Sequence, residues 1–315
     1  MNSTARDAIL TAVSYADIFD YPLTEEELQT WLPFRFSLKR PRLARQGEAL
    51  KQFCVGNITY YSLRSVKHLV ALRNKRQQWS ADKWTRARAI ATLLRCIPTI
   101  SLVGVTGGLT RSNARKDDDI DFFIITAPKT LWVTRALATI LLDILHLRRR
   151  PTDTNVNNLV CLNMFMSEDG ISVPKKERDL FTAHEVLLMT PVWEWGDMYR
   201  KFLQANRWVE KFLPKAWQEK KMNYESRIMN YEKRKSRYFY VISFILHTSY
   251  FILRLIEPAA QFIQLRYMNS RRTTEVISDN VIRFHPRDAR VWIRSALGRR
   301  LAHFNIPLDK IFYGR

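Results

Sequence analysis

The chain has 315 residues, of which 46% are hydrophobic and 12% aromatic. This composition excludes a disordered chain and is typical of a globular protein with about two or three domains. The formal net charge of +21 exceeds what solubility requires. It indicates an acidic partner, either nucleic acid, nucleotide phosphates or an anionic membrane surface, unless the surface is only generally basic.

The cysteines and the N-terminus bear on the cellular compartment. Cys54, Cys96 and Cys161 include no CxxC pair and stand in apolar stretches, so we predict small core residues rather than a disulfide framework or a zinc site. The first ten residues lack the apolar core of a signal peptide. We therefore expect a cytoplasmic protein.

Residues 1–65 begin with two predicted helices. Apolar residues recur at helical spacing over 8–16, and Asp20-Tyr21-Pro22 ends that helix. Thr24 and Glu27 then form the pattern of a capping box, in which each residue bonds the backbone of the other. The pattern predicts a second helix that starts at this point and carries Leu28.

A third helix over 42–53 and a β-hairpin with a Gly56-Asn57 turn complete this segment. Three helices followed by a hairpin predict a winged-helix-like domain over 1–65. The run FDYPLTEEEL also resembles the N-terminal winged-helix part of some bacterial and archaeal nucleotidyltransferase-like proteins. Residues 35–95 hold fifteen Lys and Arg but two acids. This surplus favours DNA or RNA contact; a packing module with solvated charges is the alternative.

The middle of the chain predicts alternating helices and strands. Two helices are expected over 66–98, with Ser80 capping the second and Pro98 closing it. The elements that follow are a strand at 99–105, a helix near 109–116, a strand at 119–126, a helix at 129–147 and a strand at 157–166.

The most informative segment is VGVTGGLTRSNARKDDDIDFFIIT, residues 103–126. Residues i and i+2 of a strand share a face, so Asp119 and Asp121 point into one small volume. Two carboxylates at so short a distance repel each other unless a cation lies between them. Gly107 and Gly108 lack side chains, so their backbone N–H groups can approach an anion. The segment predicts a site for Mg²⁺ and phosphate.

Gly107-Gly108, Arg111, Ala114-Arg115 and the acidic run 117–121 together resemble the signature of the polymerase-β-type nucleotidyltransferases. The resemblance implies a small sheet-and-helix core over 66–170, in an α/β (α+β) protein. It implies that Asp119 and Asp121 are catalytic and bind Mg²⁺ or Mn²⁺. It further implies that Thr106, Gly107, Gly108 and Arg111 bind the NTP substrate, from which a nucleoside monophosphate passes to an acceptor.

Members of that superfamily usually carry a third acidic residue on a later strand. The corresponding strand here offers Asn163, on a face that we expect it to share with Cys161 and Phe165. An amide can ligate a metal but cannot accept a proton as a general base. Two interpretations follow: an active enzyme in which Asn163 replaces the acid, or a nucleic-acid-binding or regulatory protein with a degenerate site. Asp153, Glu168 and Asp169 are further candidates.

Residues 171–315 predict a helical C-terminal domain. Residues 198–237 interleave basic and aromatic residues, which suits either a nucleic-acid surface or, more often at helical spacing, a core. Residues 238–253 contain no charged residue and follow the basic run 233–237. The segment is shorter than the roughly twenty residues of a bilayer span. We predict a buried helix; a peripheral membrane or protein partner is the alternative.

Overall fold

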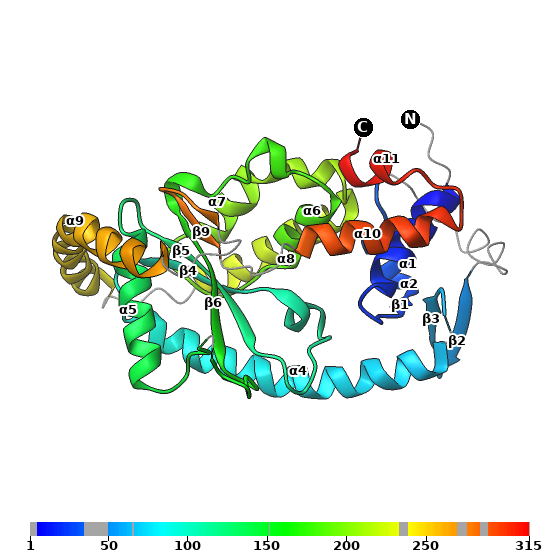
Figure 1. Ribbon diagram of the computed structural model, residues 1–315, viewed down its shortest axis with the longest axis horizontal. Helices are drawn as coiled ribbons and strands as arrows, with labels where there is room; N and C mark the ends of the chain where they lie inside the picture. The colour runs from blue at the N-terminus through cyan, green and yellow to red at the C-terminus, as the bar shows by residue number, and fades with distance from the viewer. Residues whose placement is uncertain are drawn as a thin grey trace.

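The computed structural model describes residues 5–34, 50–64, 66–150, 152–232, 239–269, 276–283 and 289–314. It is a mixed protein in which helices surround a six-stranded sheet, with a separate three-stranded sheet near the N-terminus (Figure 1). This architecture confirms the predicted α+β class. Within the described residues, no helix combines the length and apolarity that crossing a membrane requires.

The elements alternate between helix and strand through most of the chain. The helices are α1 (Ala5–Asp17), α2 (Glu25–Thr30), α4 (Val66–Leu94), α5 (Leu131–Ile144), α6 (Leu180–Leu188), α7 (Met198–Ala205), α8 (Pro214–Glu232), α9 (Phe239–Asn269), α10 (Ala289–Ala302) and α11 (Leu308–Tyr313). The strands are β1 (Leu23–Thr24), β2 (Lys51–Val55), β3 (Ile58–Ser62), β4 (Ile100–Val105), β5 (Ile120–Thr126), β6 (Val160–Ser167), β7 (Thr190–Glu194), β8 (Val276–Ile277) and β9 (Val281–Arg283). Short 3₁₀ turns are η1 (Gly107–Arg111), η2 (Glu168–Gly170), η3 (Lys175–Glu177) and η4 (Arg207–Lys211).

The N-terminal segment follows its sequence signals closely. The capping box is confirmed, because Thr24 Oγ1 accepts from the Glu27 N–H at 3.2 Å and Glu27 Oε2 accepts from the Thr24 N–H at 2.9 Å. The hairpin is confirmed as β2 and β3, with β1 completing a sheet in the order β1-β3-β2. The predicted third helix over 42–53 lies mostly outside the described residues, and its last residues, 51–53, belong instead to β2.

α4 corrects the prediction of two helices over 66–98. It is one helix of 29 residues, which runs along the molecule from the hairpin to the central sheet (Figure 1). No Gly or Pro interrupts residues 66–94, so nothing in the sequence forces a break. Ser80 does not cap a helix; its buried hydroxyl accepts the Ala114 N–H at 3.2 Å. The helix thereby anchors the segment between β4 and β5.

The central sheet has the strand order β7-β4-β5-β6-β9-β8. β5 and β6 are parallel, and the other neighbours are antiparallel. Side chains of β5 alternate between two cores: Phe122 and Ile124 face α5 and the C-terminal half of α4, whereas Phe123 and Ile125 face α6, α7 and α8. Asp121 lies on the second face, because it is two residues from Phe123.

The C-terminal region is not wholly helical as predicted, because β7, β8 and β9 all join the central sheet. The boundaries at residues 65 and 170 stay predictions. Buried residues of α1, the central sheet and the C-terminal helices belong to one continuous core. Aromatic residues of the 198–237 segment pack in this core rather than on a nucleic-acid surface. The five that are buried are Tyr199, Phe202, Phe212, Trp217 and Tyr224.

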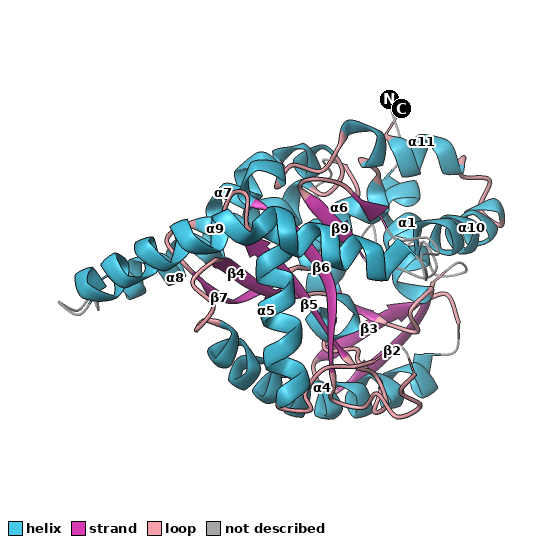
Figure 2. Ribbon diagram, turned by 60° about the vertical axis from the view of Figure 1, so that its left-hand side comes forward, coloured by secondary structure: helices cyan, strands magenta, loops and turns pink. Residues whose placement is uncertain are grey.

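The predicted buried helix over 238–253 falls on α9, and only its residues 250–253 have described side chains. There the prediction is wrong, because Phe251 and Ile252 are 63% and 57% exposed. Figure 2 shows α9 crossing α5 on the outside of the molecule. Glu257 and Gln264 bond to α5 from the inner side of α9, and Ala260, Leu265 and Met268 pack against the core from the same helix. This orientation leaves Phe251 and Ile252 on the outer side.

Candidate active site

The two aspartates lie where β5 begins, beside the turn that follows β4. The Thr106 N–H donates to the Asp121 carbonyl at 3.0 Å, and the chain then bends at Gly107, whose φ is +72°. A Cβ atom at Gly107 would stand 2.8 Å from Asp121 Oδ2, closer than packed atoms allow. Glycine is therefore required at position 107, both for its conformation and for the space that the carboxylate occupies.

Asp119, Asp121 and Cys161 each offer one ligand atom, and these atoms all lie within 4.8 Å of one another. The predicted convergence of Asp119 and Asp121 is thus present in the structure. Two carboxylate oxygens suit Mg²⁺ or Mn²⁺, whereas the thiol of Cys161 is a softer donor. The residues present fit a divalent cation held chiefly by the two aspartates.

A β-bulge at Asn163 changes which way the following residues of β6 face. Asp121 pairs with Cys161 across the parallel β5–β6 ladder, but the register shifts so that Phe123 pairs with Met164. The extra residue in β6 is Asn163. As a result Phe165 joins the core on the opposite face from Asp121, so the expectation that Cys161, Asn163 and Phe165 share one face is wrong.

The other two cysteines also differ from the prediction. Cys54 and Cys96 are exposed rather than core residues, and Cys161 is half-buried at the site. Cys96 lies just beyond the end of α4 and Cys54 on β2, where the apolar character of their neighbours does not lead to burial. Of the three cysteines, only the one on a central strand lies close to the aspartates.

Arg149 is a cation at the site that sequence reasoning missed. Its Nη1 donates to Asp119 Oδ2 at 2.7 Å, and its backbone is fixed by an N–H bond to the Val160 carbonyl. The sequence predicts a helix at 129–147 and assigns no role at the site to Arg149. The predicted phosphate contact Arg111 instead points toward the aromatic rings of Tyr15 and Phe19, with its guanidinium 5.4 and 5.2 Å from their centroids.

The pKa values at the site reflect burial and like charge. Burial and the charge of Asp119 raise the pKa of the Asp121 carboxyl to about 7. Burial also raises the pKa of the Cys161 thiol, so the thiol stays protonated in the ion-free protein. Glu185 on α6 is another buried acid; its pKa is raised by burial, and its charge contributes to the raised pKa of Asp121.

Lys83 fixes the loop that carries the aspartates. Its side chain is buried within α4, and Nζ donates to the carbonyl oxygens of Lys116 and Asp118 at 3.1 and 2.6 Å. Asn157 and Asn158 add amide oxygens at 3.0 and 3.1 Å. An ammonium surrounded by four acceptors ties the loop before β5 to the loop before β6. The basic composition of residues 35–95 concealed this role.

The remaining predicted residues divide into near and distant groups. Thr106 and Gly108 lie next to Gly107, and the buried hydroxyl of Thr106 has no hydrogen-bond partner in the described part of the chain. A Cβ at Gly108 would meet Asn113 at 3.5 Å, an ordinary contact. Glu168 lies far from the aspartates, because the preceding Ser167 pairs with Thr126 rather than with Asp121. Its carboxylate accepts a hydrogen bond from the Ser101 hydroxyl.

Comparisons with family models, curated proteins and solved structures found no match for this chain. The resemblance of residues 107–121 to the nucleotidyltransferase signature therefore stays a prediction. What bears on function is the geometry itself: two converging carboxylates, a side-chain-free turn against one of them, and an arginine that faces the other.

Proposed function

We propose that the protein is a nucleotidyltransferase that moves a nucleoside monophosphate from an NTP to an acceptor, with Mg²⁺ or Mn²⁺ as cofactor. The observation that carries the proposal is the pair Asp119 and Asp121 beside the turn at Gly107. A pair of carboxylates this close, one with its pKa raised to about 7, is held at a cost that a bound cation offsets. The glycine turn leaves room for a phosphate next to it.

In this proposal Asp119 and Asp121 hold the cation, which when bound supplies charge neutralisation to the triphosphate. The backbone at Thr106, Gly107 and Gly108 lies against the phosphates. Arg149, whose side chain is 44% exposed, faces the same volume and contributes positive charge to the transferring phosphate. Positioning and charge stabilisation then provide most of the rate enhancement.

The proton of the acceptor requires a base that is not a metal ligand. Asn163 has no acidic group, and the raised pKa of the Cys161 thiol disfavours a thiolate. Glu185 is the remaining buried carboxyl group whose charge reaches Asp121. Its pKa is raised by burial. A carboxylate can accept a proton, so we propose Glu185 for this role.

The test is transfer of label from each of the four α-labelled NTPs, in Mg²⁺ or Mn²⁺, to acceptors in a cell extract. We expect labelled product with the wild type and a loss of at least about a hundredfold with Asp119→Asn, because the cation loses a ligand. Asp117→Asn is the matched control: it lies in the same acidic run but is exposed, and it should leave transfer unchanged. Equal transfer by both variants would remove Asp119 from the site.

A regulatory protein with a degenerate site is the second candidate, and a specific observation favours it. The third position holds Cys161 rather than an acid, and Arg149 already neutralises Asp119. Such a protein binds NTP without transferring anything. Measurable Mg²⁺-dependent NTP binding together with no labelled product from any NTP would select this function over the enzyme.

The order helix, strand, helix and hairpin over residues 5–62 supports a winged-helix-like module, for which nucleic acid stays a proposed partner. The surplus of basic residues on α4 supports nucleic-acid binding less than the number of those residues suggests. Arg73, Arg76 and Lys83 are all bonded to other parts of the protein, with Arg73 paired to Glu27 at 2.7 Å. The exposed cations of α4 are the ones available to a phosphate backbone.

A further inference from the structure

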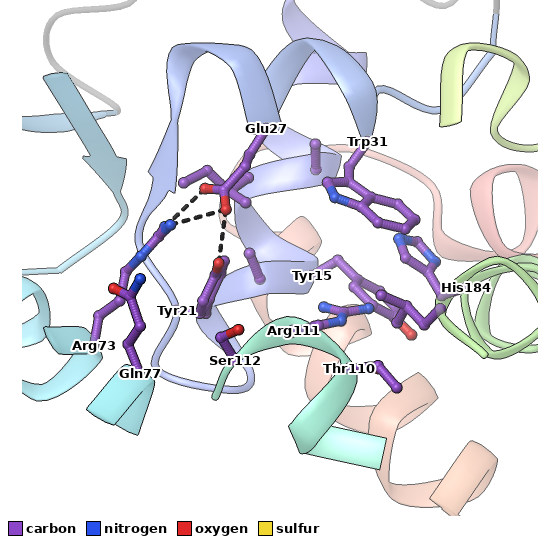
Figure 3. A pocket seen from close by; sticks show the side chains of 14 residues that line it. Tyr15, Tyr21, Glu27, Trp31, Arg73, Gln77, Thr110, Arg111, Ser112 and His184 are labelled. Carbon is purple, nitrogen blue, oxygen red and sulfur yellow. Dashed lines mark hydrogen bonds and ion pairs between the residues drawn. The ribbon is translucent and has the colours of Figure 1, made fainter. Parts of the chain in front are cut away.

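A cavity of about 370 Å³ lies between the N-terminal helices, α4, η1 and α6. Arg111, Tyr15, Trp31 and His184 line one side of it, and Tyr21, Glu27 and Arg73 the other (Figure 3). Its volume is typical of small-molecule sites. It lies at the opposite end of η1 from Gly107, the residue that contacts Asp121, and the proposed transfer chemistry does not use it.

The charges in the cavity do not balance. Both carboxylate oxygens of Glu27 accept hydrogen bonds from the Arg73 guanidinium. They also accept from the Tyr21 hydroxyl and the Thr24 N–H. Burial lowers the pKa of His184 well below its usual value, so the ring is neutral and stacks on Tyr15 at 3.9 Å. These groups together contribute no net charge.

Arg111 is the cation left over. Its guanidinium lies over the rings of Tyr15, Phe19 and Trp31, and the ion pairs among the described residues do not include it. Glu185 lies within electrostatic range of Arg111 without forming an ion pair with it. Tyr15 is 2% exposed, and its hydroxyl lies beside the Arg111 guanidinium.

We infer that this cavity binds a small organic anion. The fork of Arg111 suits a carboxylate or phosphate group, which it can bond through two parallel N–H donors. The hydroxyl of Ser112, which also lines the cavity, adds a donor. The planar or apolar body of the ligand packs against Trp31 and Tyr21. The lining comes from six separate elements, so the bound anion joins the N-terminal helices to η1.

The test is calorimetry in EDTA, so that the aspartate site contributes nothing, with inorganic phosphate, nucleoside 5′-monophosphates and benzoate as probes. We expect an organic phosphate or carboxylate to bind the wild type and Asp119→Asn alike, and at least tenfold more weakly to Arg111→Met. Arg115→Met, an exposed arginine of the same segment, is the control and should bind as the wild type does.

If Arg111→Met does not fold, Arg111→Lys keeps the charge but not the fork and should weaken binding several-fold. The nucleosides that lack the phosphate serve as uncharged control probes. If they bind as strongly as the monophosphates, the proposal is overturned, because no anion is then recognised. Binding that survives in Arg111→Met, or no binding by any probe, would also overturn it. Failure of the proposed transferase function would leave these results unchanged, since they are measured without a divalent ion.

A second inference concerns α9, which turns two polar side chains toward the protein and several large apolar ones outward. Glu257 accepts from the N–H groups of Trp132 and Val133 at 2.9 and 2.8 Å, and thereby caps the start of α5. Gln264, two turns later, bonds the Trp132 carbonyl at 2.7 Å and the Arg135 side chain. Glu257 and Gln264 thus face the protein and fix the orientation of the helix, whereas Arg254 and Arg266 are exposed.

The outward face of α9 is apolar as a consequence. Seven large hydrophobic side chains on it are between 47% and 67% exposed: Phe251, Ile252, Leu255, Ile256, Phe262, Ile263 and Tyr267. They follow helical spacing as two adjacent rows, a stripe wider than the single seam of a coiled coil. Monomeric soluble proteins rarely expose an apolar surface of this extent, and those that do use it for binding.

Charge identifies the occupant. The sequence places Lys233-Arg234-Lys235-Ser236-Arg237 before α9 and Arg271-Arg272 after it, and Glu257, the one acid between residues 239 and 269, faces α5. Basic residues at both ends of an apolar helix match anionic lipid headgroups at both ends of a patch of acyl chains. We propose that α9 docks the protein on the surface of an anionic lipid bilayer.

The test is co-sedimentation of the full chain with phosphatidylcholine vesicles, with or without phosphatidylglycerol. We expect binding to the anionic vesicles, reduced at least tenfold in Phe262→Ser/Ile263→Ser. The control is Met222→Ser/Val291→Ser: these residues are 65% and 68% exposed, as far as Phe262 and Ile263 are, but lie on α8 and α10. It should bind as the wild type does.

Three results would overturn membrane docking. The first is no binding of the wild type to anionic vesicles. The second is binding that the α9 variant retains in full, which would indicate charge attraction by the rest of the surface. The third is a wild-type dimer in sedimentation analysis that the α9 variant converts to a monomer, which would make a second copy of the chain the occupant.

Discussion

Replacing Asp121 with asparagine is expected to stabilise the ion-free protein at pH 8 while it abolishes nucleotide transfer. Burial and the neighbouring Asp119 raise the pKa of Asp121 to about 7, against about 3.9 in an unfolded chain. Above neutral pH the folded protein therefore carries a buried charge that the unfolded chain accommodates in water. The asparagine amide has the same shape and lacks that charge.

The direction of the pH dependence follows from proton binding. Between about pH 4 and pH 7 the folded wild type holds a proton that the unfolded chain has lost, so its stability falls as the pH rises through this window. Each unit of pKa difference corresponds to about 1.4 kcal/mol. We expect Asp121→Asn to remove this pH dependence. Its free energy of unfolding at pH 8 should exceed that of the wild type by roughly 2–4 kcal/mol.

Thermal and urea denaturation in EDTA between about pH 5 and pH 8 would measure the effect. Added Mg²⁺ or Mn²⁺ should stabilise the wild type and not the variant, since the cation compensates the charge that asparagine lacks. The exposed Asp117, changed to asparagine, should give the wild-type profile. An Asp121→Asn protein less stable than the wild type throughout this range would show that the carboxylate is satisfied without a cation.

The second large effect is expected from Gly107→Ala. Its φ of +72° is costly for any residue with a Cβ, by about 1–2 kcal/mol. The new Cβ would also stand 2.8 Å from Asp121 Oδ2, so the carboxylate must move. We expect divalent-ion affinity to fall at least about tenfold, and transfer by more, because small displacements of a positioned group cost about a hundredfold.

Gly108→Ala is the matched control, because a Cβ there makes an ordinary contact of 3.5 Å with Asn113. It should leave Mn²⁺ binding at the wild-type level, measured by calorimetry or electron paramagnetic resonance. Its NTP affinity separates two roles: a large loss indicates that a phosphate approaches Gly108 closely, and no loss indicates a turn residue. Equal Mn²⁺ affinities for Gly107→Ala and the wild type would contradict the close approach to Asp121.

The sequence by itself determined the features that depend on neighbours along the chain. Thr24 and Glu27 cap a helix in the way that their spacing predicts, and Gly56 with Asn57 turns the hairpin. The pair Asp119 and Asp121 converges because alternation along a strand is a local property. Asn163 was misplaced for the same reason: one extra residue in β6 shifts the register, and no local pattern announces a bulge.

The tertiary structure alone decided which distant residues complete each site. Cys161 and Arg149 reach the aspartates from a neighbouring strand and a preceding loop. Lys83 on the long helix α4 holds the loop before them, and Arg111 turns away into a cavity lined by six elements. The exposure of α9 was also hidden, because an apolar run reads the same whether it enters a core or faces outward. Burial depends on which face the polar contacts of Glu257 and Gln264 fix against the protein, and those contacts join residues more than a hundred positions apart.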